Sequence, residues 1–145
     1  MTKSRRELDK ERKATEKALA LVKALSIVAF IIHGLFLLGV CLVFVLFFTS
    51  SGNGYFRSSE KTVLIVVAAV IGVFSLSAIN GVISMRKGKK KGFFYFATGS
   101  LILAAITFTA VYIAWSQQSQ LLNVFIGLVL VFLVFALGSQ QKYLK

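Results

Sequence analysis

The first long apolar stretch of the sequence contains two residues whose side chains could take part in a chemical reaction, His33 and Cys41. An imidazole can exchange a proton near neutral pH or bind a metal ion, and a thiolate can act as a nucleophile. The chain has one histidine and one cysteine, so it offers no metal-binding cluster, no histidine set for haem and no intramolecular disulfide. We therefore interpret His33 as a neutral side chain hydrogen-bonded to a facing helix, with a proton-responsive or ligand-binding role as the alternative. Cys41 is interpreted as a small packing residue.

Charged side chains are absent from all four long apolar stretches of the sequence. Ion-coupled transporters, proton relays and voltage sensors place ionisable groups at membrane depth, so these classes are disfavoured. The sequence also contains no Ser/His/Asp set, no zinc-ligand spacing and no phosphate-binding loop. We expect a protein that is not an enzyme and that uses no cofactor and no metal ion.

Polar and small residues recur at helical spacing in the second and third apolar stretches. They are Ser77, Asn80, Gly81 and Ser84 in the second stretch, and Thr98, Thr109 and Tyr112 in the third. These residues predict either a polar cavity between two helices or a hydrogen-bonded seam that holds the helices together. We favour the seam, because small residues let membrane helices approach closely and hydroxyl groups bond across them.

The elements that must position these residues are four apolar segments. The chain has 145 residues, of which 57% are hydrophobic and 15% charged, with a mean hydropathy of +0.82. Soluble domains carry roughly 45–50% apolar and about 25% charged residues. A helix needs about 20 apolar residues to cross a bilayer, and the segments are apolar at consecutive positions, unlike the strands of a membrane barrel. We predict an all-α fold, an antiparallel four-helix transmembrane bundle over 24–138, with spans at 24–48, 62–85, 93–115 and 121–138.

Residues 1–23 are predicted to form a charged helix that runs directly into the first span. Ser4 and Glu7 fit a capping box, in which two side chains satisfy the free backbone donors at a helix start. Asp9 and Lys13, and Arg12 and Glu16, are opposite charges spaced four residues apart. Residues 139–145 form a short polar tail.

Basic residues indicate the orientation of the spans, because Lys and Arg resist translocation. Of the 17 Lys and Arg residues, fifteen belong to the N-terminal segment, the second connection or the tail, and two, Arg57 and Lys61, to the first connection. We therefore expect both termini in the cytoplasm. The second connection carries a basic cluster that we interpret as a topology signal and that also attracts anionic lipid: Arg86, Lys87, Lys89, Lys90 and Lys91. Because these charges flank apolar segments rather than cover a soluble face, a nucleic-acid partner is not expected.

The segment 80–92 (NGVISMRKGKKKG), which continues into Phe93 and is followed by Gly99, resembles the central hairpin of small four-span membrane proteins that are common in Gram-positive bacteria. The resemblance covers this hairpin and the overall length of the chain, and the long charged N-terminal segment is not a usual part of the pattern. It implies a bacterial cell membrane and transfers no functional residue.

We predict a small non-enzymatic membrane protein that acts as an accessory, regulatory or immunity subunit through helix–helix and cytosolic contacts. Its expected partners are the lipid bilayer and either another membrane protein or a second copy of itself. The alternative is a transporter or channel, acting as an oligomer, for a small neutral or lipophilic solute.

Overall fold

The computed structural model describes residues 5–49, 58–113 and 120–144. It contains four α-helices, α1 (Arg5–Thr49), α2 (Ser58–Arg86), α3 (Lys91–Ile113) and α4 (Gln120–Ser139), followed by a short 3₁₀ helix, η1 (Gln141–Tyr143). The helices pack antiparallel, and each contains a stretch long and apolar enough to cross a membrane. The prediction of an all-α, four-helix membrane protein is therefore confirmed. Residues 50–57, between the first and second spans, and 114–119, between the third and fourth, lie outside the described part of the chain.

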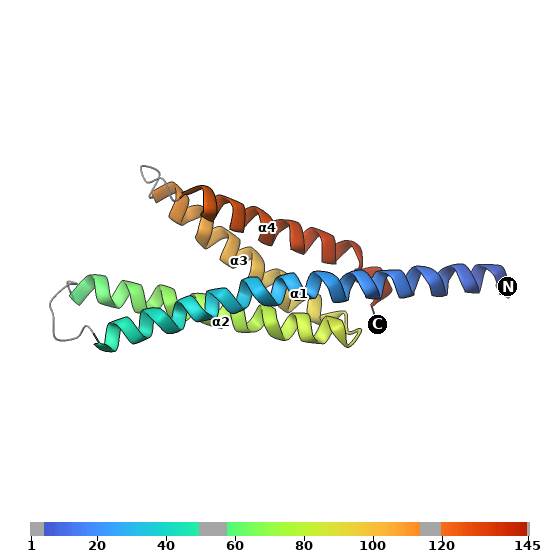
Figure 1. The fold of residues 1–145 in the computed structure, drawn as a ribbon, viewed down its shortest axis with the longest axis horizontal. Helices are drawn as coiled ribbons and strands as arrows, with labels where there is room; N and C mark the ends of the chain where they lie inside the picture. The colour runs from blue at the N-terminus through green and yellow to red at the C-terminus, as the bar shows by residue number, and fades with distance from the viewer. Residues whose placement is uncertain (1–4, 50–57, 114–119, 145) are drawn as a thin grey trace.

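Helix α1 is much longer than a bilayer is thick. Its 45 residues span about 67 Å at 1.5 Å per residue, against a hydrocarbon core of roughly 30 Å. The charged segment continues into the first apolar stretch without a break, and it projects beyond the other three helices (Figure 1). The chain has no proline, so no residue of α1 lacks a backbone donor.

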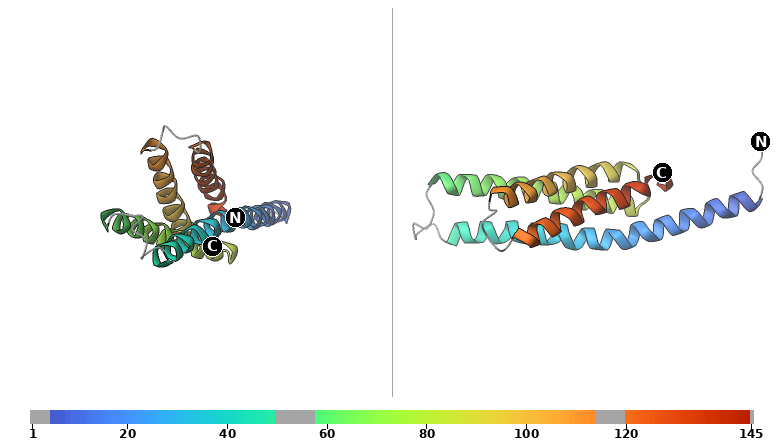
Figure 2. Two further views of the ribbon diagram at one scale, coloured as in Figure 1. Left: turned by 60° about the vertical axis from the view of Figure 1, so that its left-hand side comes forward. Right: turned by 90° about the horizontal axis from the view of Figure 1, so that it is seen from above.

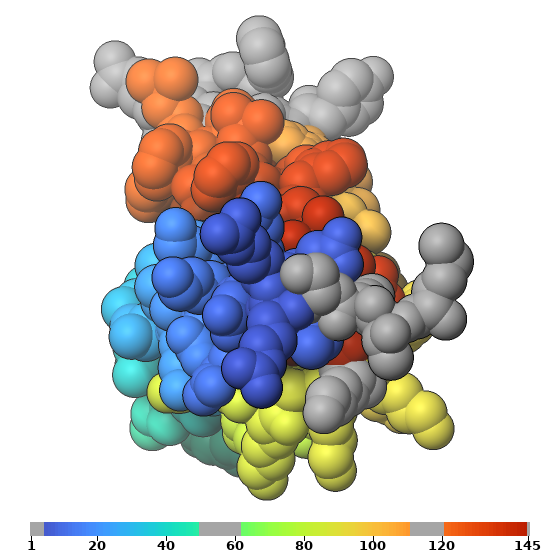
Figure 3. Space-filling view, turned by 90° about the vertical axis from the view of Figure 1, so that its right-hand side faces the viewer, coloured from blue at the N-terminus to red at the C-terminus, as the bar shows by residue number. Residues whose placement is uncertain are grey.

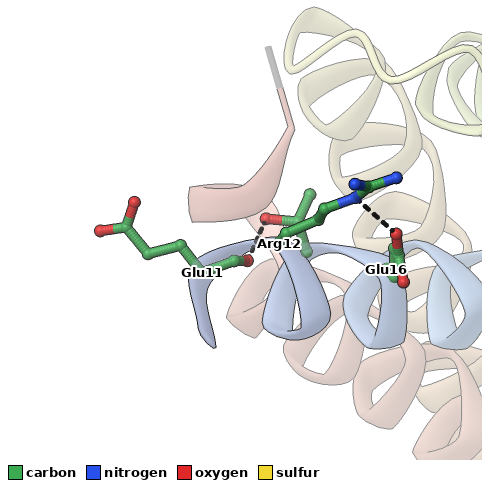
Figure 4. A network of polar contacts seen from close by, with 4 residues as sticks. Glu11, Arg12 and Glu16 are labelled. Carbon is green, nitrogen blue, oxygen red and sulfur yellow. Dashed lines mark hydrogen bonds and ion pairs between the residues drawn. The ribbon is translucent and has the colours of Figure 1, made fainter. Parts of the chain in front are cut away.

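Two polar contacts in the projecting part of α1 lie within the helix itself (Figure 4). Arg12 Nε donates to Glu16 Oε1 at 3.2 Å, and the Thr15 hydroxyl donates to the Glu11 carbonyl oxygen at 2.9 Å. Asp9 and Lys13, which have the more favourable charge order for a helix, make no ion pair in the described chain. These exposed contacts add little to stability.

The turn between α2 and α3 ends α2 in a Schellman motif. The amide of Lys89 donates to the Ser84 carbonyl at 3.0 Å, and the amide of Gly88 donates to the Met85 carbonyl at 2.8 Å. Gly88 has a φ of 79°, a left-handed conformation that a residue with a Cβ adopts only with strain. This turn reverses the chain within a few residues and so brings α2 and α3 directly together.

Three glycines set the distance between α2 and α3. A Cβ added to Gly92 would lie 2.5 Å from the Gly81 carbonyl oxygen, and one added to Gly99 would lie 2.5 Å from the Phe74 carbonyl oxygen. A Cβ added to Gly81 would meet the Phe96 amide nitrogen and the Gly92 carbonyl oxygen. The two backbones are therefore in direct contact, as small residues permit between membrane helices.

The bundle consists of two hairpins, α1–α2 and α3–α4, which pack against each other near the 86–91 turn and diverge toward the opposite end (Figures 1 and 2). The larger core cluster lies near the turn and includes Val22, Val82, Met85, Phe96 and Leu137. A smaller cluster of Leu103, Ala104 and Leu130 lies further along α3 and α4. Large apolar side chains on the outside, such as Phe135 at 74% exposure, form the surface expected to contact lipid.

Candidate functional site

Polar side chains from α1 and α3 meet in the interior of the bundle. The Nε2 atom of His33 lies 3.1 Å from the hydroxyl oxygen of Ser100, and both residues are 0% exposed. The tautomer of the imidazole decides which of the two groups donates the hydrogen bond. The ring of Phe96 packs edge-on against the imidazole, with 5.9 Å between the ring centroids. This hydrogen bond joins two different helices, α1 and α3.

Ser75 adds a buried hydroxyl from α2 close to the level of this bond along the bundle. The Phe74 carbonyl of α2 lies against Gly99 of α3. Ser75 and Ser100 are the next residues along each helix, so both serines lie beside this backbone contact. Ser75 is 0% exposed. The Ser75 hydroxyl and the Nδ1 atom of His33 have no hydrogen-bond partner within the described residues. We call His33, Ser75 and Ser100 the buried polar centre.

The chemistry available to the buried polar centre is that of hydrogen bonding. Within the described residues, no group of three or more His, Cys, Asp or Glu side chains could hold a metal ion. Cys41, on the same helix as His33, is a free and exposed cysteine. The His33–Ser100 bond joins α1 to α3, and contacts of this kind between membrane helices contribute about 0.6 kcal/mol on average.

The polar residues that the sequence singles out on α2 and α3 differ in burial. Gly81 is buried, Ser77 and Ser84 are half-buried, and Asn80 is exposed. On α3, Thr98 and Thr109 are exposed, and the Thr109 hydroxyl donates to the Ala105 carbonyl at 2.8 Å within its own helix. Tyr112 belongs to α3, but its side chain lies outside the described part of the chain. Gly81 and Ser84 therefore lie at the α2–α3 contact, whereas Asn80, Thr98 and Thr109 are on the outer surface of the bundle.

Sequence reasoning missed Ser75 and Ser100 as interior residues, along with Gly92 and Gly99 as contact residues. The spacing of seven residues between Gly92 and Gly99 places both on one face of α3, and this repeat was the available signal. The serines carried no such signal, because a membrane helix is apolar on both its lipid face and its interior face.

A stripe of basic side chains runs along the projecting part of α1. Its members, which we call the basic stripe, are Arg6, Lys10, Lys13 and Lys17, and all four are exposed. At 3.6 residues per turn, these positions fall within a sector of about 60°. That sector lies about 130° round the helix from the buried residues Ala18 and Val22, by the same geometry.

Two other basic groups lie at the same end of the molecule as the basic stripe. The five basic residues of the 86–91 turn are all exposed, and the turn lies below α1 where Figure 3 looks onto this end. Lys142 belongs to η1, and its ammonium nitrogen lies 4.9 Å from the centroid of the Tyr143 ring. The end that carries both termini is therefore strongly basic.

The C-terminal tail packs against α1 where that helix leaves the bundle. Leu144 is 3% exposed and belongs to the same core cluster as Val22, Leu133 and Leu137. Tyr143 lines a surface groove of about 440 Å³ together with Lys10, Glu11, Ala14 and Thr15. We call residues 141–144 the C-terminal clasp, because they hold the base of the projecting helix against the bundle.

The geometry alone must carry the functional assignment. A comparison of the chain with protein-family models, with curated proteins and with solved structures finds no match.

Proposed function

We propose that this protein is a non-enzymatic accessory or regulatory subunit of a membrane complex, and that the projecting part of α1 binds an acidic surface of a partner protein. The observation that carries the proposal is the exposed basic stripe on a helix that extends well beyond the membrane-spanning bundle. The fifteen-to-two distribution of Lys and Arg favours the cytoplasm for this end of the molecule.

The distance of the basic stripe from the membrane favours a protein over a lipid partner. If Lys23 marks the edge of the hydrocarbon, Lys17 lies about 9 Å and Arg6 about 26 Å beyond it. The headgroup layer is about 5–8 Å thick, and the Debye length at physiological salt is about 8 Å. Anionic headgroups therefore attract Lys17, whereas Arg6 and Lys10 lie beyond their reach.

The charges of the basic stripe are available for a partner. Within the described chain, none of its four side chains forms an ion pair or a hydrogen bond, whereas the neighbouring Arg12 pairs with Glu16. A row of cations at helical spacing complements a row of carboxylates on a partner helix, and such complementarity directs partner choice and speeds association.

The stiffness of α1 supports a docking role. The helix is continuous from the membrane to Arg5, and the C-terminal clasp packs against its base at Val22. A preformed helix loses little conformational entropy on binding, so more of the interaction energy appears as affinity. The alternative of a polar transport path between α2 and α3 receives no support from Asn80, Thr98 and Thr109, which are exposed.

Co-purification of two matched charge variants tests the proposal. The first replaces Lys10, Lys13 and Lys17 with Gln on the basic stripe, and the second replaces Lys89, Lys90 and Lys91 with Gln in the turn. Both variants lose three positive charges at the same end of the molecule. Membranes of the native host, solubilised in mild detergent, should yield the chain with a defined partner for the wild type and the turn variant, and without it for the stripe variant.

Three results would count against the proposal. One is a wild-type chain that purifies as a monodisperse monomer with no partner. Another is a partner whose yield falls equally in both charge variants, which would indicate dependence on total charge. The third is a partner that stays bound to the stripe variant at raised salt, since exposed charge pairs weaken as salt is added.

A further inference from the structure

Two polar groups in the interior of the bundle have no hydrogen-bond partner within the described residues, the Ser75 hydroxyl and the Nδ1 atom of His33. Both residues are 0% exposed. The two groups are not bonded to each other either, so a third group is needed to satisfy them. A buried polar group without a partner costs free energy, above all in a bundle surrounded by hydrocarbon, and an ordered water molecule is a common partner for such groups.

The hydroxyl of Ser75 behaves differently from other hydroxyls in the membrane-spanning helices. Ser26, Thr107 and Thr109 each donate to a backbone carbonyl oxygen three or four residues earlier in their own helix, at 2.6–2.8 Å. Such a bond is the usual way in which a serine or threonine is satisfied inside a helix. Ser75 makes no bond of this kind, so its hydroxyl is left to a group that lies between the helices.

Ser75 lies on the side of α2 that faces both α1 and α3. Gly72 faces α1, because a Cβ added to it would lie 3.6 Å from the Cγ1 atom of Val40. Ala78 faces α3, because its Cβ would lie 3.0 Å from a Cβ added to Gly99. Ser75 comes three residues after Gly72 and three before Ala78, so at 3.6 residues per turn it lies midway between them, about 60° from each. Its side chain is therefore at the place where α1, α2 and α3 meet.

His33 approaches the same place from α1. Its Nε2 atom lies 3.1 Å from the hydroxyl oxygen of Ser100 on α3. Ser100 and Ser75 both adjoin the contact between Phe74 and Gly99, so the two serines lie at the same level along the bundle. The Nδ1 atom belongs to the same small ring as Nε2, so it also lies close to that level.

We propose that the buried polar centre binds one water molecule, which bridges the Nδ1 atom of His33 and the Ser75 hydroxyl. Water both donates and accepts hydrogen bonds, so it suits either tautomer of the imidazole. A charged ligand is disfavoured, because the four apolar stretches contain no charged side chain to balance it. The water completes a hydrogen-bonded connection between α1, α2 and α3 and so ties the two hairpins together. This site is inside the bundle and is independent of the proposed partner on the projecting part of α1.

The direction of a stability change tests the site. Removal of a hydroxyl without a partner should leave the protein equally or more stable, whereas removal of one that holds a bridging water should destabilise it. We expect Ser75→Ala to raise the equilibrium constant for unfolding in sodium dodecyl sulfate by about threefold, as for an average hydrogen bond between membrane helices. In a His33→Phe background, where the ring has no nitrogen, the same substitution should have no such effect.

Ser77→Ala is the matched control for this comparison. Ser77 is half-buried on the same helix, about 160° round α2 from Ser75. Its replacement should have the same effect in the wild-type and His33→Phe backgrounds. A Ser75→Ala protein at least as stable as the wild type would overturn the proposal, as would an effect of Ser75→Ala that is equal in the two backgrounds.

A second measurement detects the water itself and does not depend on the His33→Phe protein. The chain has one histidine, so labelled histidine in an otherwise deuterated chain gives one set of ring signals in an NMR spectrum. Magnetisation transferred from water to this ring should be observed in the wild type and in Ser77→Ala, and should be several-fold weaker in Ser75→Ala. A direct bond between His33 and Ser75 would couple the two residues without this transfer. No transfer in the wild type, or equal transfer in all three proteins, would therefore overturn the proposal.

Discussion

At the scale of single residues, the glycines of α3 show how little room the α2–α3 contact leaves. A Cβ at Gly99 would lie 2.5 Å from the Phe74 carbonyl oxygen and 3.0 Å from the Ala78 Cβ, and neither helix backbone can give way independently. Gly34, on α1, has no atom within 4 Å of the corresponding position. One substitution should therefore have opposite consequences at the two sites.

We predict that Gly99→Ala destabilises the protein by about 1–3 kcal/mol, the range seen when a methyl group is forced into a packed interior. Gly34→Ala should be neutral or stabilising by up to about 1 kcal/mol, because alanine favours helix more than glycine does. Unfolding by sodium dodecyl sulfate in mixed micelles, followed by circular dichroism, gives both values. A Gly99→Ala protein as stable as the wild type would show that α2 and α3 lie further apart than described.

The His33–Ser100 bond permits a double-mutant cycle with His33→Ala, Ser100→Ala and the double variant. We predict that His33→Ala is the more destabilising single change, since it removes a fully buried ring and its contact with Phe96. The coupling between the two positions should be about 0.6 kcal/mol and at most about 1.7 kcal/mol, as for other hydrogen bonds between membrane helices. Additive losses in the same unfolding assay would mean that the bond contributes nothing to stability.

At the scale of helices, the sequence predicted the membrane helices themselves but not which face of each helix turns toward the interior of the bundle. Long charge-free stretches predict membrane helices because the backbone in lipid must bond internally. The face that turns inward is harder to predict, because lipid and protein interior are equally apolar and hydrophobicity does not separate them. Asn80 was expected at a seam and is exposed, whereas Ser75 drew no attention and is buried. The C-terminal clasp is a tertiary contact that the short polar tail gave no reason to expect.

The C-terminal clasp leads to a testable prediction at the scale of helices. Leu144→Ala removes a side chain that is 3% exposed and packs in the cluster of Val22, so the base of the projecting helix should loosen. Trypsin should then cleave after Lys17 and Lys23 several times faster than in the wild type. Leu21→Ala, at a position 43% exposed on α1, is the matched control and should leave the cleavage rate unchanged. Equal rates in all three proteins would show that the clasp does not restrain α1.

At the scale of the whole molecule, the two ends of the bundle differ in charge, and this difference sets its expected orientation in the membrane. Fifteen of the 17 Lys and Arg residues belong in the sequence to the N-terminal segment, the 86–91 turn or the tail, and two belong to the first connection. The N-terminal segment contributes eight of the fifteen and the 86–91 turn five. Short basic segments next to spans resist translocation, and the first span usually dominates the outcome.

The N-terminal segment alone should therefore hold the orientation. We predict that a chain with all five basic residues of the 86–91 turn replaced by Gln keeps the 86–91 turn in the cytoplasm, since ten basic residues would still face two. Single cysteines introduced in a Cys41→Ala background, Gly88→Cys in the turn and Ser51→Cys in the first connection, report the orientation through a membrane-impermeant maleimide on intact cells. Ser51→Cys should be labelled in intact cells and Gly88→Cys only after lysis, both with and without the five Gln substitutions. If Gly88→Cys is labelled in intact cells only when the five basic residues are replaced by Gln, the basic residues of the turn are needed to orient the chain. If Gly88→Cys is labelled in intact cells when these basic residues are present, the basic stripe lies outside the cell, where the proposed partner could not reach it.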